Sequence, residues 1–422
     1  MRLPKPRNVL AAILLSLAIV ALGLLIAQDQ ETLRVRTSLA ADDPRFPVYL
    51  SRLLGHVLTE RDTVVVHTNG PAAFPAMLKA IGAAQHRISF ETYIFDAGEV
   101  AGHFAEAFAA AARRGVDVRL VVDSLGAKAM DPDHIALMEE AGCTIGWFNP
   151  VASFSLEEAN YRTHRKALVT DGEVAFVGGI GIADQWMHDS EAYPRWRDTQ
   201  LEFRGPIALD IEAAFNENWI ETGGVVDPDL LAHDTPREGS ARSIAVWSSP
   251  EGGANSIKLL YLMALAASRQ TLDIQSPYFI TDESTEWSLM EARNRGVRVR
   301  LLVEGDITDA KPVKYASRAS YERLLAAGIE IYEYQPTMMH TKAMMVDGAI
   351  SIAGSANFDN RSLELNDELN VAVFDRALAA RLLEDFERDL TKSMKLDLER
   401  WRSRPIHIEM REKMWSFFGE VF

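Results

Sequence analysis

The chain has 422 residues, of which 48% are hydrophobic and 25% charged, so it can form two or three globular domains without a disulfide or a metal to complete a core. Its 60 acidic and 44 basic residues give a net charge of −16, which repels polyanions and makes nucleic acid an unexpected partner. Cys143 is the only cysteine, so the chain forms no intrachain disulfide. A single thiol is consistent with either side of a membrane, so the cysteine content does not indicate the cellular compartment.

The first predicted element is an apolar helix near the N-terminus. Three basic residues, Arg2, Lys5 and Arg7, precede an uncharged apolar run over 9–27. As a helix this run would be about 28 Å long, which matches the hydrocarbon core of a bilayer. A cleaved signal peptide is the alternative, but its apolar core is usually ~7–15 residues long, and GLLIAQD is a poor cleavage site.

We therefore favour a transmembrane anchor over 9–27, with residues 1–8 in the cytoplasm because basic flanks stay on that side. This predicts a single-pass protein of the plasma (inner) membrane whose catalytic body lies outside the cytoplasm. Arg34 and Arg36 follow the span and oppose this orientation.

After a connector over 28–61, the chain divides into two similar halves, 62–224 and 240–395, joined by a polar linker over 225–239. Each half predicts helices that alternate with strands, and matching segments recur, such as MEEAGCTIGWFNP and LLAAGIEIYEYQP. Such alternation predicts an α/β fold with parallel strand pairs and helices on both faces of the sheet. A repeat of this length indicates a duplicated domain rather than a solenoid, so we expect two α/β halves packed as a pseudo-dimer.

Each half also contains one copy of the same motif, HRKALVTDG at 164–172 and HTKAMMVDG at 340–348. If each motif is a strand, its His and Lys project to one face, and a charged Lys on a buried strand is costly unless it faces a site. An isolated His in this setting is most simply a core residue, but two copies of the whole motif argue against that. A metal site is disfavoured because Lys is a poor ligand and no neighbouring Cys or His has ligand spacing.

Two imidazoles and two ammonium groups that converge suit phosphoryl transfer. One imidazole attacks phosphorus and becomes covalently attached, while the other protonates the leaving alkoxide and then deprotonates the incoming alcohol. The lysines neutralise the phosphate, so no metal or other cofactor is expected. Since each half supplies one His and one Lys, we expect a single site at the seam between the halves.

The paired H-x-K-x4-D motifs resemble those of the phospholipase D superfamily, and ETYIFD, WRDTQLEFRGP and SPYFI resemble its bacterial cardiolipin synthase branch. The resemblance covers residues 62 to the C-terminus. It implies that one motif His, usually that of the first half, is the nucleophile and the other the acid/base. The catalytic residues that it implies are His164, Lys166, Asp171, Asp198, His340, Lys342, Asp347 and Glu368, and the phosphate-binding residues are Lys166, Gly179, Lys342, Ser355 and Asn357.

Within that set we expect different roles for the carboxylates. Asp171 and Asp347 should mainly fix the turn after each motif, whereas Asp198 and Glu368 should orient the imidazoles. The alternative for the second pair is an exposed or helix-capping carboxylate. Gly181 stands where the family usually has Asn, so one phosphate donor is missing from the first half.

The C-terminal tail over 396–422 is aromatic and partly basic, so it suits either a membrane interface or a helix packed on the second half.

The leading hypothesis is a membrane-anchored phosphatidyl transferase that makes cardiolipin from two phosphatidylglycerols and releases glycerol. A phospholipase D that uses water is the nearest alternative, and a phosphodiesterase or nuclease of the superfamily and a non-catalytic lipid-binding protein are further ones. The expected partners are a phospholipid and a membrane, and the oligomeric state stays open.

Overall fold

The computed structural model describes residues 32–150, 161–191, 194–226, 237–249 and 255–417. Within these ranges no helix has the length and apolarity that a bilayer-spanning segment needs. The predicted anchor over 9–27 lies outside the described residues, so its helix stays a prediction.

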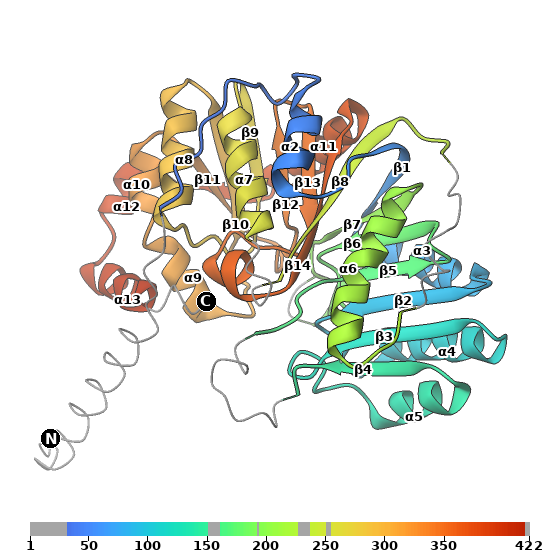
Figure 1. Ribbon diagram of the computed structural model, residues 1–422. Coiled ribbons are helices and arrows are strands. Elements are labelled where there is room, and N and C mark those ends of the chain that lie inside the picture. Colours follow the sequence, from blue (N-terminus) through green and yellow to red (C-terminus); the bar gives the residue numbers. More distant parts are fainter. Residues whose placement is uncertain (1–31, 151–160, 192–193, 227–236, 250–254, 418–422) are drawn as a thin grey trace, which may run out of the picture.

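The connector and the first half contain helices and strands in the predicted alternation (Figure 1). They are α2 (Phe46–Leu54), β1 (Thr59–Thr68), α3 (Gly70–Ala83), β2 (Arg87–Thr92), α4 (Glu99–Arg113), β3 (Asp117–Asp123), α5 (Pro132–Ala141), β4 (Thr144–Phe148), β5 (Ala167–Thr170), β6 (Val174–Gly178), a 3-10 turn (Asp184–Trp186), β7 (Thr199–Arg204) and α6 (Ile207–Glu221).

The second half repeats this order and ends in two short helices. Its elements are β8 (Ala241–Ser248), α7 (Ser256–Ala267), β9 (Thr271–Gln275), α8 (Glu283–Asn294), β10 (Arg298–Glu304), α9 (Lys311–Arg318), α10 (Tyr321–Ala326), β11 (Glu330–Tyr334), β12 (Ala343–Val346), β13 (Ile350–Gly354), a π-helical turn (Arg361–Leu365), β14 (Glu368–Phe374), α11 (Arg376–Leu390), β15 (Ser393–Lys395), α12 (Leu398–Arg402) and α13 (Ile406–Ser416).

The fifteen strands of the described ranges form one sheet, in the order β15-β11-β10-β9-β12-β13-β14-β8-β1-β7-β6-β5-β2-β3-β4. Apart from β15, the two ends of the sheet have matching strand orders: β4-β3-β2-β5-β6-β7-β1 in the first half corresponds to β11-β10-β9-β12-β13-β14-β8 in the second. The duplication that the sequence predicts is therefore present in the topology. The expected parallel pairs occur as β2-β3-β4 and β9-β10-β11. The middle of the sheet is antiparallel, which the sequence did not predict, and β8 joins the halves by pairing with β14 and β1.

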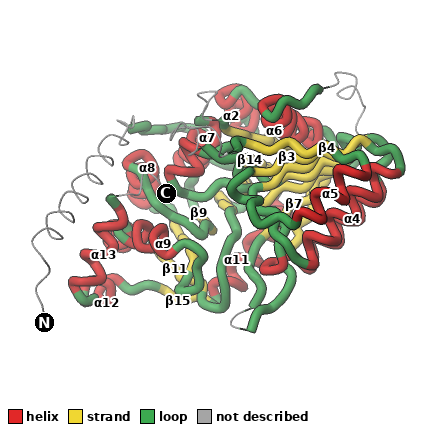
Figure 2. The backbone as a smooth tube through the Cα atoms, turned by 90° about the horizontal axis from the view of Figure 1, so that it is seen from below, coloured by secondary structure: helices red, strands yellow, loops and turns green. Residues whose placement is uncertain are grey.

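Helices cover both faces of the sheet, as Figure 2 shows. One apolar cluster lies within the first half and another within the second, where Phe46 and Leu50 of α2 join it. A third cluster draws on both halves and packs under α6 and α11. The helix α6 contacts β8 and α11 contacts β1, so each of these helices crosses the seam. The two halves therefore share a core and hold their facing edges in a fixed relation.

The motif aspartates end each motif strand by bonding to backbone. Asp171 has a left-handed backbone (φ 53°) and accepts hydrogen bonds from the N–H groups of Gln85, His86 and Arg87 at 2.8–2.9 Å. Asp347 has the same φ and accepts from Arg269, Gln270 and Thr271 at 2.8 Å. Each carboxylate thus fixes the start of the neighbouring strand, β2 or β9, which runs antiparallel to the motif strand.

We expect Asp171→Ala to lower the free energy of unfolding by roughly 2–4 kcal/mol, because three backbone N–H groups lose their acceptor and alanine is strained at positive φ. Asp171→Asn should lose less, since it keeps one oxygen and tolerates this conformation. Thermal unfolding of the detergent-solubilised full chain, followed by circular dichroism, measures the difference. Loss of catalysis with an unchanged Tm would instead give Asp171 a direct catalytic role.

Candidate active site

The motif histidines lie just before their strands, at the seam. The prediction that His164 and Lys166 lie on a strand needs correction, because β5 begins at Ala167, and β12 likewise begins after Lys342. Both motif starts are extended segments that pair with the opposite half instead. Isolated parallel bridges join Thr163 to Asp367 and Arg197 to Met339.

These two bridges fix the positions of the histidine backbones. The N–H of His164 donates to the Asp367 carbonyl at 2.8 Å, and the N–H of His340 donates to the Arg197 carbonyl at 2.7 Å. Each donor and its acceptor come from different halves. The residue after each acceptor is a carboxylate, so the backbone pairing brings that carboxylate to the imidazole.

Each imidazole contacts the carboxylate of the other half. His164 Nδ1 lies 2.8 Å from Glu368 Oε1, and His340 Nδ1 lies 2.8 Å from Asp198 Oδ2. Both carboxylates are fully buried, so the alternative of an exposed or capping group is wrong. Because Nδ1 of each ring faces a carboxylate, it carries the hydrogen, and Nε2 is left for the substrate.

Burial and charge set the protonation of these pairs. Desolvation lowers the pKa of His164 to about 4 against the attraction of Glu368, so this imidazole is neutral near pH 7. Burial also lowers the pKa of His340, as does Lys342, and Asp198 opposes both. Desolvation alone would raise the pKa of Glu368, but His164 and Lys166 hold it at about 2. Glu368 is therefore ionised, and His164 has the neutral form that a nucleophile needs.

The motif lysines lie in the same buried site. Lys166 and Lys342 each donate to the carbonyl of the histidine two residues earlier, at 2.7 Å. Desolvation lowers the pKa of Lys166 to about 7 and that of Lys342 to about 8. The charge on Lys342 contributes to the lowered pKa of Lys166, so the lysines of the two halves share one electrostatic site.

Two of the predicted phosphate ligands have other hydrogen-bond partners in the structure, and their assignment stays a prediction. The Ser355 hydroxyl donates to Glu368 Oε2 at 2.5 Å, and its N–H donates to the Leu369 carbonyl. The N–H of Gly179 donates to the Thr199 carbonyl at 3.3 Å. Asn357 is 5% exposed, and its Oδ1 has no hydrogen-bond partner within the described residues, so its role stays a prediction.

The first half holds its carboxylate in a different way. Trp186 is fully buried, and its Nε1–H donates to Asp198 Oδ2 at 2.9 Å, the same oxygen that contacts His340. A Cβ on Gly179 would lie 2.4 Å from Asp198 Oδ1, and one on Gly181 would lie 3.2 Å from the Trp186 ring. Gly179 therefore leaves space for the carboxylate, whereas a Cβ at 181 would be in tight contact with Ile94 at 3.0 Å as well as with the indole.

Several aromatic residues of the site were missed by sequence reasoning. The His340 ring lies 5.5 Å from Trp186 and 5.6 Å from Trp196, measured between centroids. Tyr93 lies 5.4 Å from the His164 ring, and Lys166 Nζ lies 5.6 Å from the Tyr93 ring. Their place in ETYIFD, DQW and WRDT next to predicted site residues was the available signal.

Asp171 and Asp347 are separated from the histidines by the whole length of β5 and β12. They are not brought to the imidazoles, so the structure assigns them to the turn rather than to the chemistry. Across the described ranges, no group of three or more His, Cys, Asp or Glu side chains is arranged to hold a metal ion.

Known proteins resemble this chain in sequence and in fold. The family model described as "Cardiolipin synthase, PLD-like domain" matches residues 77–219 and 261–390. The chain is 32% identical to a cardiolipin synthase of Geobacillus kaustophilus, over 86% of this chain and 73% of that protein. It is also 32% identical to a probable cardiolipin synthase of Bacillus subtilis, over 93% and 79% respectively. The crystal structure of a phosphatidylserine synthase from Haemophilus influenzae has the same fold, with a TM-score of 0.69 and 12% identity over 89% of this chain and 100% of that one.

We expect Trp186→Phe to lower kcat about tenfold, because it removes a hydrogen bond to a charged carboxylate. With one donor fewer, Asp198 attracts a proton on His340 more strongly, so the pKa of His340 should rise in the pH profile of kcat. Ser355→Ala is the matched variant, since it removes the corresponding donor from Glu368. Steady-state kinetics over pH and a Tm measurement test both. A lower Tm with unchanged kcat and pH profile would make Trp186 a packing residue only.

Proposed function

Because the chain belongs to the cardiolipin synthase family of phospholipase D-like proteins, we propose that it transfers a phosphatidyl group between two phosphatidylglycerol molecules, forming cardiolipin and glycerol. The observation that carries this proposal is the crossed arrangement of His164 with Glu368 and of His340 with Asp198 at one seam. In this arrangement a carboxylate holds Nδ1 of each imidazole, and Nε2 of each ring is available to the substrate.

In the first step, His164 Nε2 attacks the phosphorus of the donor lipid, so a P–N bond forms and the P–O bond to glycerol breaks. His340, which takes up a second proton when the lipid phosphate binds, gives its Nε2 proton to the departing glycerol oxygen. Lys166 and Lys342 neutralise the non-bridging oxygens, whose charge develops as the bond breaks. The products are free glycerol and a phosphatidyl group on His164.

In the second step, a hydroxyl of the second phosphatidylglycerol gives its proton to His340 Nε2, and its oxygen attacks phosphorus. The P–N bond breaks and His164 returns to its starting state. Glu368 and Asp198 keep each ring in the tautomer that both steps need. Water in place of the second lipid would give phosphatidic acid by the same steps.

Two variants test the mechanism. His164→Ala and His340→Ala should each lower turnover about 10³-fold or more, because each removes either the nucleophile or the proton donor. His103→Ala on the exposed surface of α4 is the control and should keep activity. Mass spectrometry of reactions with phosphatidylglycerol vesicles should find cardiolipin and glycerol in equal amounts. Phosphatidic acid as the main product would make the chain a hydrolase, and an active single His variant would contradict the two-histidine mechanism.

We further propose that the anchor over 9–27 crosses the plasma membrane once, with its basic N-terminus in the cytoplasm and the catalytic body outside. A cysteine added at the C-terminus reports this orientation in a Cys143→Ser background. The replacement removes a thiol that is buried and whose pKa burial raises to about 11, so the added cysteine is the only thiol left to label. An impermeant maleimide should label the added thiol in intact cells or spheroplasts. Labelling only after lysis would place the catalytic body in the cytoplasm.

A further inference from the structure

The helix α13 has an apolar stripe that faces solvent. Ile406, Met410 and Met414 are 72%, 66% and 54% exposed. Their spacing of four residues places all three within an arc of about 80° on one side of the helix. The other side packs on α9, where Arg411 lies 3.9 Å from the centre of the Tyr315 ring. The stripe is therefore separate from the surface that attaches α13 to the fold, where the buried Glu412 pairs with Arg318 and Arg404.

The helix α9 connects this stripe to the rim of the active site. It begins just after Asp309, which accepts a hydrogen bond from the Tyr278 hydroxyl at 2.5 Å. The charge of Asp309 acts on both His340 and Lys342. Figures 1 and 2 show α13 beside α9, at the edge of the second half where α9 begins.

The path of the chain from its N-terminal segment leads to the same edge. Thr32 donates to Glu283 at 3.0 Å and the N–H of Leu33 donates to Ser284 at 2.9 Å, at the start of α8. The helices α8 and α9 follow the carboxyl ends of the neighbouring parallel strands β9 and β10, so both start at one edge of the sheet. The predicted anchor ends at residue 27, so at most about 17 Å of extended chain separates it from this edge.

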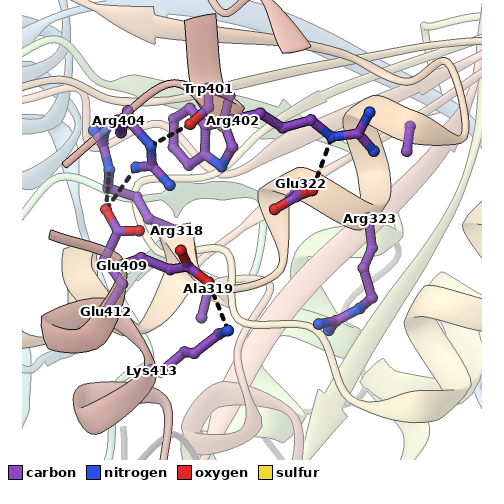
Figure 3. Close-up of a pocket in the computed structure, with 11 residues that line it drawn as sticks. Arg318, Ala319, Glu322, Arg323, Trp401, Arg402, Arg404, Glu409, Glu412 and Lys413 are labelled. Atoms are coloured by element: carbon purple, nitrogen blue, oxygen red, sulfur yellow. Dashed lines mark hydrogen bonds and ion pairs between the residues drawn. The ribbon is translucent and has the colours of Figure 1, made fainter. Parts of the chain in front are cut away.

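Cationic side chains surround a cavity of about 250 Å³ between α9–α10 and α12–α13, in a chain whose net charge is −16 (Figure 3). Trp401 lies within it, with Arg404 3.4 Å from the centre of its ring. Three carboxylates line the same cavity, and Glu333 and Glu286 beside it pair with Arg318 and Arg323, so each cation has an acidic partner. The cationic residues are Arg318, Arg323, Arg402, Arg404 and Lys413.

We propose that α13 docks on the surface of a phospholipid bilayer, with Ile406, Met410 and Met414 at the level of the upper acyl chains. This goes beyond the proposed reaction, because it describes how the body of the protein sits on a membrane. Because α9 begins beside the active site, docking at this edge places the rim of the active site near the lipid surface. A phospholipid headgroup then reaches the histidines without the lipid leaving the bilayer.

A fluorescent probe on the stripe tests the docking without any measurement of activity. Met410→Cys in a Cys143→Ser background is labelled with an environment-sensitive dye, and the full chain is reconstituted in phosphatidylglycerol bilayers with or without brominated acyl chains. The control is Leu53→Cys on α2, an exposed apolar residue (41%) on a helix that Figure 1 shows at the opposite edge. The probe at 410 should lose at least half of its emission with brominated lipid, and the probe at 53 should not change. Equal emission at 410 in both bilayers overturns the proposal, whether the stripe faces solvent, a second copy or another segment of the chain.

A kinetic comparison separates docking from catalysis. Met410→Glu with Met414→Glu should lower kcat/KM on phosphatidylglycerol vesicles about tenfold, because carboxylates are repelled by an anionic bilayer. The same variant should act normally on a short-chain phosphatidylglycerol dispersed as monomers, and Leu53→Glu should be normal on both substrates. Equal losses on both substrates, or no loss on vesicles, would overturn the docking. Absence of cardiolipin with the unaltered chain would instead contradict the proposed function and leave the quenching result standing.

Discussion

The site depends on two short backbone contacts that cross between the halves. The hydrogen bonds from His164 to the Asp367 carbonyl and from His340 to the Arg197 carbonyl place a carboxylate of one half against the imidazole of the other. Neither half alone has both members of a pair. The continuous sheet through β8 and the shared core under α6 and α11 hold the two edges in register. Duplication thus yields one site from two domains, because each copy completes the other.

The two copies are not equivalent, and the difference has a local physical cause. In the second half the Ser355 hydroxyl donates to Glu368, and in the first half the Trp186 indole donates to Asp198. A glycine stands at 179, where the second half has Ser355, since a Cβ there would overlap the Asp198 carboxylate. Each orienting carboxylate therefore accepts a hydrogen bond from a neighbouring side chain, but the donor is a hydroxyl in one half and an indole in the other. The indole also packs against His340.

The sequence predicted the duplication, the parallel strand pairs and the motif residues because the repeat is long and its hydrophobic pattern is regular. It also predicted that Asp171 and Asp347 are structural and that Asp198 and Glu368 orient imidazoles. It did not predict the exchange of carboxylates between halves, because pairing across a seam leaves no local pattern. Trp186 was missed for a similar reason. The chain turns back between Trp186 and its partner Asp198, and the hydrophobic pattern of the sequence does not predict how that turn is shaped. The assignment of Ser355 to phosphate stays a prediction, although in the structure its hydroxyl donates to Glu368.

The charges of the site explain how an acidic chain holds an anionic substrate. With both imidazoles neutral, Lys166 and Lys342, whose pKa values are lowered to about 7 and about 8, face the carboxylates of Asp198 and Glu368. A phosphodiester adds one negative charge in a buried site, where an uncompensated charge is costly. The added anion opposes the desolvation that lowers the pKa values of Lys166, Lys342 and His340, so we infer that it keeps both lysines charged and draws a proton onto His340. That proton is the one which the leaving glycerol oxygen requires, so the same electrostatics that favour binding the lipid phosphate also charge the general acid.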